Sequence, residues 1–214
     1  MQPPPRLTHR SALLAGIEHA FEVDAPEDVR IVKQVHGAVV VSVRASDEPM
    51  RLSACEGDAL VTAAPGVALG ARSADCVPVL LADPRSGHVA AAHAGWRGVV
   101  GGVVPAAAVA LVELGARTPD LRVALGPSIG PCCFEVGDEV AAQFPAATVH
   151  VRPGGKPTVD LRHALVLQLA ACGVTPDHLD AAAPCTYCDA ASWPSYRREG
   201  AAAGRLVGWI RHPV

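Results

Sequence analysis

Two histidines and one cysteine stand out because each lies at the end or bend of an apolar stretch: His36, Cys76 and His93. Thiolate sulfur and imidazole nitrogen are ligands that zinc prefers, and three protein ligands leave a fourth tetrahedral position open for water or substrate. This donor set is typical of a catalytic metal site. The spacings match no short zinc-binding signature, however, and on these residues alone a buried, inert thiol with two backbone-bonded histidines is the more ordinary interpretation.

The segments that must position these three residues have the pattern of strands. Four short apolar stretches, DALVTA, VALGARS, VPVLLAD and HVAAAHA, follow one another between residues 58 and 94 and are separated by Gly, Pro and Asp. We expect them to form one sheet system, with Cys76 and His93 at neighbouring strand ends. The stretch IVKQVHGAVVVSV (31–43) predicts one or two strands bent at Gly37, which places His36 beside a turn.

Helices are expected on either side of the remaining strands. Residues 98–114 form a helix of small residues in which Pro105 marks either a kink or the true start. Residues 135–144 and 160–173 show helical periodicity, and short strands are expected near 17–23 and at RLVGWI (205–210). Because strands and helices do not alternate regularly, we predict an α+β fold, a layered single domain over residues 1–214 with mixed β-sheets flanked by helices.

The overall composition narrows the possible functions. Half of the residues are hydrophobic and 18% are charged, which excludes a disordered chain. The net charge of −3 provides no basic footprint for nucleic acid or an anionic membrane. The most apolar segment, 99–112, is too short to span a bilayer, and the apolar run at 12–17 is too short for a signal peptide. We therefore expect a cytoplasmic, soluble protein with small-molecule partners and unknown oligomeric state.

The chain has seven cysteines, an odd number that argues against a disulfide framework. Cys185 and Cys188 form CTYC, a spacing used by redox dithiols and zinc ribbons, but no second CxxC accompanies it, so a structural or incidental role is expected. Cys132 and Cys133 are adjacent and would point apart on an extended chain.

A series of motifs gives a more specific indication. They are KQVHG (33–37), GDALVT (57–62), SADCVPVLLADP (73–84), AAAHAGWRG (90–98), LGPSIGPCCFEVG (125–137) and SYRREG (195–200). Together they resemble the bacterial family named multicopper polyphenol oxidoreductase laccases, also labelled peptidoglycan editing factors, whose members include purine nucleoside enzymes. The resemblance runs in order from about residue 33 to residue 210.

The resemblance implies a zinc site built from His36, Cys76 and His93, with copper as a possible alternative ion. It also implies phosphorolysis of adenosine, inosine, guanosine and methylthioadenosine, and deamination of adenosine. The partners would then be purine nucleosides and phosphate. The family's usual arginine–glycine signature is missing near the N-terminus, so residues 1–29 form a shortened N-terminal arm, which puts the substrate preference in doubt but not the metal ligands.

These reactions require a proton carrier and groups that bind phosphate. Asp75 qualifies as the carrier only if the chain bends beside Cys76, and Asp58 is the alternative, although it could equally be a turn or capping residue. Arg72, Arg97 and Arg197 could bind phosphate, with Arg197 favoured because it belongs to the SYRR motif; Arg97 and Arg197 could also be surface ion-pair partners. Trp96 could stack on a purine, although core packing is its commoner role.

Three other functions remain to be separated from this one. Copper oxidation of phenols is improbable because the nine histidines include no His-x-His pair. A hydrolase, such as an amidase editing peptidoglycan precursors, could use Cys76 as nucleophile and His93 as base. A non-enzymatic redox or interaction module could use CTYC, in which case Cys185 would matter and Cys76 would not.

Overall fold

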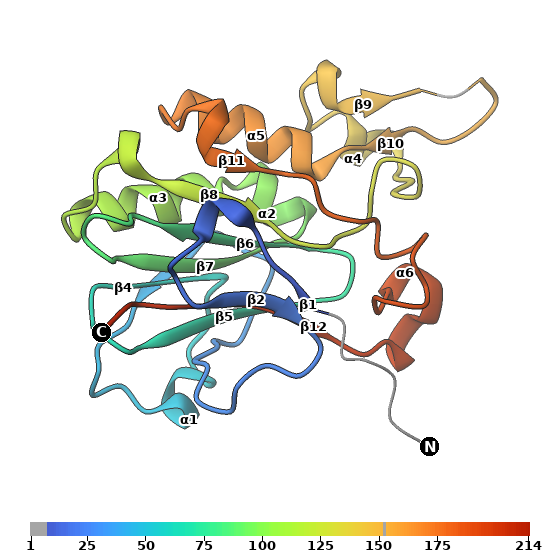
Figure 1. The fold of residues 1–214 in the computed structure, drawn as a ribbon. Helices are drawn as coiled ribbons and strands as arrows, with labels where there is room; N and C mark the ends of the chain where they lie inside the picture. Colours follow the sequence, from blue (N-terminus) through green and yellow to red (C-terminus); the bar gives the residue numbers. More distant parts are fainter. Residues whose placement is uncertain (1–7, 152) are drawn as a thin grey trace.

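Residues 8–151 and 153–214 are described by the structure, a computed structural model. Strands of small and β-branched residues form a six-stranded sheet in the order β11-β8-β6-β7-β4-β3 (Figure 1). The two edge pairs, β11 with β8 and β3 with β4, are parallel, and the inner pairs are antiparallel, so the sheet is mixed. The strands are β3 (Val40–Ser42), β4 (Ala59–Thr62), β6 (Val77–Ala82), β7 (Val89–Ala94), β8 (Arg122–Leu125) and β11 (Leu179–Asp180).

A second, fully antiparallel sheet packs against one face of the first. Its order is β1-β2-β12-β5, and its strands are β1 (Thr8–His9), β2 (His19–Glu22), β5 (Ala68–Ser73) and β12 (Leu206–Arg211). Phe21, Leu69, Leu80 and Ile210 are among the buried side chains of the cluster between the sheets. Strands from both ends of the chain therefore complete this layer.

Helices α2 (Trp96–Val100), α3 (Val103–Glu113) and α5 (Leu161–Ala171) cover the opposite face of the six-stranded sheet (Figure 1). The expected helix 98–114 is divided by Gly102, whose φ of 76° lies in the left-handed region. Pro105 falls in the first turn of α3, where its missing N–H costs no hydrogen bond. Asp160 caps α5 by accepting a hydrogen bond from the His163 N–H.

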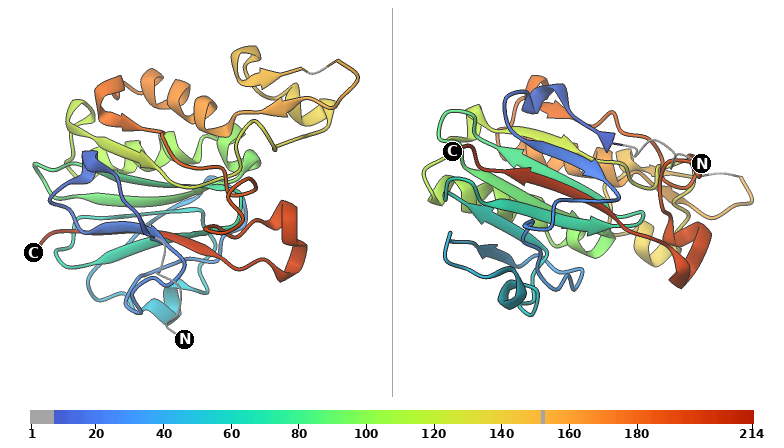
Figure 2. Two further views of the ribbon diagram at one scale, coloured as in Figure 1. Left: turned by 45° about the vertical axis from the view of Figure 1, so that its right-hand side comes forward. Right: turned by 60° about the horizontal axis from the view of Figure 1, so that its bottom comes forward.

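The remaining elements are short. The helices α1 (Pro49–Leu52), α4 (Asp138–Ala141) and α6 (Tyr196–Glu199) each contain about one turn. The hairpin of β9 (Val149–His150) and β10 (Thr158–Val159) projects beside α5 (Figure 2). Single 3₁₀ turns lie at Ala12–Leu14, Thr118–Asp120, Ala146–Thr148, Pro176–His178 and Gly200–Ala202.

The predicted α+β class with layered, mixed sheets is confirmed. The four strands expected between residues 58 and 94 are β4, β5, β6 and β7, and those expected near 17–23 and 205–210 are β2 and β12. The four do not form one sheet as expected, because β5 pairs with β12 in the antiparallel sheet and only β4, β6 and β7 join the six-stranded sheet. The helix expected over 135–144 was too long, because only α4 forms there. No described helix is long and apolar enough to cross a membrane.

The segment 31–43 departs most from the expected pattern. Only β3, at its C-terminal end, joins a sheet ladder, whereas Lys33 makes one isolated bridge to Glu56. The backbone N–H groups of Val35, His36 and Gly37 donate instead to the side chain of Asp58. Of the one or two strands predicted here, only β3 forms, because the Asp58 carboxylate takes the backbone hydrogen bonds of residues 35–37 that a neighbouring strand would otherwise take.

Candidate metal centre and pocket

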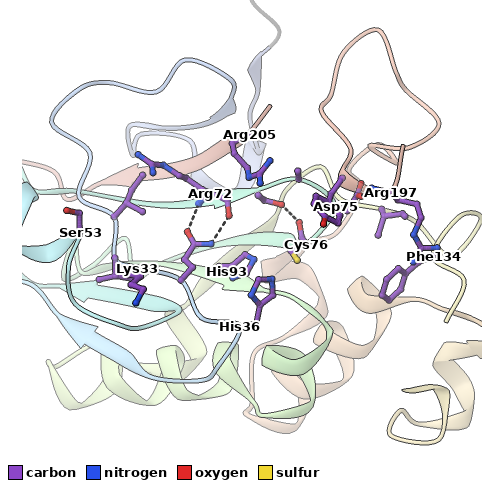
Figure 3. Close-up of a pocket in the computed structure, with 17 residues that line it drawn as sticks. Lys33, His36, Ser53, Arg72, Asp75, Cys76, His93, Phe134, Arg197 and Arg205 are labelled. Atoms are coloured by element: carbon purple, nitrogen blue, oxygen red, sulfur yellow. Dashed lines mark hydrogen bonds between the residues drawn. The ribbon is translucent and has the colours of Figure 1, made fainter. Parts of the chain in front are cut away.

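His36, Cys76 and His93 converge in the structure (Figure 3). The sulfur of Cys76 and one nitrogen from each histidine all lie within 4.8 Å of one another, and the two imidazole rings meet edge to face. Register explains part of this convergence: Val77, at the start of β6, pairs with Ala94 at the end of β7, so Cys76 and His93 lie at the same end of an antiparallel pair. His36 is brought in by the 33–37 loop.

Asp58 connects this loop to the sheet. Its Oδ1 accepts hydrogen bonds from the His36 N–H and from His93 Nδ1, both at 2.9 Å, and its Oδ2 accepts from the N–H groups of Val35 and Gly37 at 3.2 and 2.6 Å. Such a concave set of backbone N–H groups stabilises an anion. Because Nδ1 of His93 donates to the carboxylate, Nε2 is the ring nitrogen left for a metal, which would take the place of the Nε2 proton.

The backbone at His36 is adapted to this role. Its φ of 60° lies in the left-handed region, which non-glycine residues seldom occupy and which histidine tolerates better than most. This conformation allows the three consecutive N–H groups to point at one side chain. The local strain is thus compensated by the bonds to Asp58, a pattern common at functional sites.

The three candidate ligands also affect one another electrostatically. Burial raises the pKa of the Cys76 thiol, but hydrogen bonds with His36 and His93 outweigh this effect and lower it to about 7. Burial lowers the pKa of His93, but Asp58 and Cys76 raise it to about 9. Burial also raises the pKa of Asp58, yet His93 and the backbone donors bring it below its ordinary value. The carboxylate form of Asp58 is therefore favoured near neutral pH, and the thiolate form of Cys76 is readily reached there.

Gly95 lies against two of the candidate ligands. A Cβ atom at this position would lie 2.8 Å from His36 Cδ2 and 3.0 Å from Cys76 Sγ. Both distances are shorter than ordinary van der Waals contacts, so a side chain here would displace the imidazole or the thiol. The glycine of the HAGWRG motif therefore permits close approach of the chain to the centre.

Asp75 was a candidate proton carrier only if the chain bends beside Cys76, and the structure contains such a bend. Its φ of 85° shows that the chain bends immediately before Cys76, so Asp75 and Cys76 both line the same pocket. Its carboxylate accepts hydrogen bonds from the Thr186 hydroxyl at 2.7 Å and from the Arg197 N–H at 2.6 Å. Asp75 thus joins the centre to the C-terminal part of the chain, whereas Asp58 lies behind His93, with 1% of its surface exposed.

The centre opens into a pocket of about 780 Å³ rich in cationic side chains. Arg72 and Arg197 line it as the sequence suggested, and Figure 3 shows Arg205 and Lys33 there too. The Arg197 guanidinium lies 5.6 Å from the centre of the Phe134 ring. The pocket can therefore bind an anion close to the candidate metal ligands.

Sequence reasoning missed Lys33, Phe134, Tyr196 and Arg205 among the pocket residues. The first three could have been identified from the sequence, because they fall inside the motifs KQVHG, CCFEVG and SYRREG. Arg205 precedes an ordinary strand, and its lining position depends on how β12 enters the sheet.

Trp96 and Arg97, two further candidates from the sequence, lie outside the pocket. The Arg97 guanidinium lies 4.4 Å from the centre of the Trp96 ring, and Trp96 packs against the core beneath the helices. Neither residue lines the pocket. Trp96 therefore packs on the core, which is its commoner role, and Arg97 lies exposed at the surface rather than in the pocket.

Layered sheets bring a thiol and two imidazoles together in a cationic pocket, which makes this site a candidate metal centre of an enzyme. The chain belongs to the multi-copper polyphenol oxidoreductase laccase family, whose model matches residues 12–212.

Relatives with assigned names resemble nearly the whole chain. It is 39% identical to a purine nucleoside phosphorylase of Deinococcus radiodurans, over 99% of this chain and 79% of the relative. It is 42% identical to the purine nucleoside phosphorylase SCO2081 of Streptomyces coelicolor, over 93% of this chain and 82% of the relative. It is 38% identical to the adenosine deaminase RL5 of an unknown prokaryotic organism, over 86% of this chain and 75% of the relative.

Solved structures agree with this assignment. YlmD of Geobacillus stearothermophilus superimposes with a TM-score of 0.85 at 26% identity, covering 100% of this chain and 98% of the other. The Neisseria meningitidis protein NMB0706 superimposes with a TM-score of 0.82 at 28% identity, covering 98% and 99%. The family resemblance inferred from the motifs is confirmed.

Proposed function

We propose that this protein is a zinc-dependent purine nucleoside phosphorylase that also deaminates adenosine, with residues 1–214 acting as one domain. The observation that carries the proposal is the convergence of His36, Cys76 and His93 at the base of a cationic pocket. The names of the relatives supply the substrate class.

The chemistry of the donor set supports zinc. Two imidazoles and one thiolate suit this ion, and a carboxylate that orients one imidazole is a common partner of zinc ligands. The same donors with a weak axial methionine would suit an electron-transfer copper site. Met50, the only methionine in the described residues, has 83% of its surface exposed and does not line the pocket, which favours zinc over a methionine-ligated copper centre.

Phosphorolysis requires phosphate to be held against the ribose. A phosphate oxygen forms a bond to C1′, the glycosidic bond breaks, and its electron pair leaves with the purine, which takes up a proton. We assign phosphate binding to Arg72, Arg197 and Arg205, because guanidinium groups match phosphate oxygens in geometry and charge. Phe134 and Tyr196 offer ring surfaces to the purine.

Deamination adds water to the purine C6 and releases ammonia. Zinc, when bound, supplies Lewis acidity and makes a water molecule easier to deprotonate near neutral pH. We assign proton transfer to Asp75, because this residue lines the pocket next to Cys76. Asp58 is assigned a positioning role, because its four hydrogen bonds hold His93 and the 35–37 loop.

Product analysis tests this proposal. Zinc-loaded protein is incubated with adenosine, with and without phosphate, and the products are separated by chromatography. We expect phosphate-dependent adenine and phosphate-independent inosine, both lost in Cys76→Ser. Arg205→Gln should raise the KM for phosphate at least tenfold and leave deamination nearly unchanged, whereas Arg44→Gln, an exposed arginine outside the pocket, should alter neither reaction. Absence of both products from zinc-loaded protein would contradict the proposal.

A thiol hydrolase remains the second candidate, since Cys76 and His93 favour a thiolate beside a protonated imidazole. A chelator distinguishes the two functions. Removal of the metal should abolish the nucleoside reactions and zinc should restore them, whereas a thiol hydrolase would keep its amidase activity without metal.

A further inference from the structure

We propose that Cys132, Cys133, Cys185 and Cys188 form a second metal site that binds a structural zinc ion. Their four sulfur atoms all lie within 4.8 Å of one another. The site is distinct from the pocket, since none of the four cysteines lines it. Four thiolates fill the coordination sphere of zinc and leave no position for substrate, as in structural zinc sites.

The sulfur positions are close to those that zinc requires. A tetrahedral ion with Zn–S bonds of about 2.3 Å separates its ligand sulfurs by roughly 3.8 Å. The sulfur of Cys188 lies 3.6 Å from that of Cys132 and 3.3 Å from that of Cys133. No disulfide joins any of these cysteines. Small rotations of the side chains would bring the four sulfurs to the distances of a zinc complex.

Two turns bring the cysteine pairs together. On an extended chain the side chains of Cys132 and Cys133 would diverge, but the backbone N–H groups of Cys133 and Phe134 both donate to the carbonyl of Gly130 at 3.0 Å. This turn places both thiols on the side facing CTYC. The CTYC segment turns in the same way, with the Asp189 N–H donating to the Cys185 carbonyl at 3.0 Å.

The two turns are also connected directly. The N–H of Gly130 donates to the Cys185 sulfur at 3.2 Å, and the N–H of Thr186 donates to the Ser128 carbonyl at 3.0 Å. A backbone N–H directed at a cysteine sulfur stabilises the thiolate that a metal requires. The adjacent cysteines therefore take the place of the second CxxC that the sequence lacks.

Arg198 fixes the turn that carries two of the four cysteines. The Arg198 guanidinium donates to the carbonyls of Thr186 and Tyr187 at 2.7 and 2.9 Å, so it is anchored on the CTYC turn. The same guanidinium is ion-paired with Glu199, so Arg198 serves to hold the shape of the turn that carries Cys185 and Cys188.

A metal at this position would support one wall of the pocket. Cys133 and Cys188 are 55 residues apart in the chain, so a shared ion closes a long loop. Thr186, inside CTYC, donates to Asp75, and Phe134 follows Cys133 and lines the pocket. The zinc ion would thus hold two pocket groups in place without contacting the substrate.

Zinc content measured by elemental analysis tests the proposal. The full chain, purified under reducing conditions with zinc present and then freed of loosely bound metal, should hold about two zinc ions. Cys188→Ser should hold about one, and so should Cys76→Ser, because each variant loses a different ion. Cys55→Ser removes an exposed thiol outside both clusters and should retain both ions. This design separates failure of this proposal from failure of the catalytic centre. Equal zinc content in Cys188→Ser and wild type would overturn the second site.

A measurement on the wild-type protein covers the case in which the variants fail to fold. The thiols of the four cysteines should resist alkylation until a chelator removes zinc, and mass spectrometry of their peptides would detect the change. Rapid alkylation of zinc-loaded protein, or a disulfide between Cys133 and Cys188 in place of bound metal, would overturn the proposal.

Discussion

Replacement of Asp58 by asparagine should weaken metal binding at the centre without removing a ligand. The carboxylate accepts four hydrogen bonds, two at each oxygen. Asparagine has one oxygen and a donor NH₂ group, so one pair of donors loses its acceptor in either orientation of the amide. If the NH₂ group faces His93, the imidazole carries its proton on Nε2 and the metal-binding lone pair is lost.

The magnitude follows from the bonds that are lost. Each buried donor left without a partner costs about 1–3 kcal/mol, so two donors reduce the free energy of unfolding by about 2–6 kcal/mol. Loss of such a carboxylate partner typically weakens metal binding about 10- to 100-fold, or about 1.4–2.7 kcal/mol. We expect Asp58→Asn to show both effects.

Competition with a chromogenic chelator measures the change in zinc affinity, and urea unfolding of the metal-free protein measures stability. Asp83→Asn is the matched control, because Asp83 is also 1% exposed and accepts hydrogen bonds from the N–H groups of Arg85, Ser86 and Arg117, away from the centre. Asp83→Asn should lose stability and keep wild-type zinc affinity. Wild-type zinc affinity in Asp58→Asn would refute the reasoning.

Three further predictions follow from local geometry. Gly95→Ala should weaken zinc binding at least tenfold in the same competition assay, because the added Cβ would overlap His36 and Cys76. Gly204→Ala, whose added Cβ has its nearest contact at 3.7 Å, should keep wild-type zinc affinity. Equal zinc affinities of the two variants would contradict this explanation. Burial raises the pKa of Asp83, but backbone donors hold it below its ordinary value of 3.8, so Asp83 stabilises the fold above that pH and the contribution is lost as the pH falls through the lower folded value. The stability difference between wild type and Asp83→Asn in urea titrations should therefore shrink below about pH 4, and a constant difference would show that ionisation is not its cause. Asp160→Ala should lower the free energy of unfolding by about 1 kcal/mol, because α5 loses its N-cap; restoration by Asp160→Ser would confirm the cause, and an unchanged midpoint would count against it.

Local pattern predicted the parts of the fold in which neighbouring residues decide the outcome. Strands β4 to β7 and β12 follow from short apolar runs between turn residues, and α5 follows from its helical periodicity. The 33–37 loop could not be predicted in this way, because its hydrogen bonds go to Asp58, more than twenty residues later in the chain. The length of α4 was likewise overestimated from periodicity alone.

Motifs located the candidate centre, whereas side-chain roles depended on direction. His36, Cys76 and His93 were identified by donor type and by family resemblance, but only the turn at Asp75 determined that this residue shares a pocket with Cys76. Trp96 was near enough in sequence to be a candidate, yet its ring packs on the core. Direction depends on backbone dihedral angles and packing, which motif spacing does not specify.

By itself the sequence determined the α+β class, the positions of most strands along the chain, the donor types of the centre and the family. The tertiary structure alone decided that Asp58 holds the 35–37 loop, that Arg205 completes the cationic pocket, and that four cysteines from two distant turns meet. The physical reason is the separation along the chain over which each kind of interaction acts. Propensity and periodicity act over a few neighbouring residues, whereas hydrogen bonds to a buried carboxylate and the approach of four sulfurs require the packed sheets to bring distant segments together.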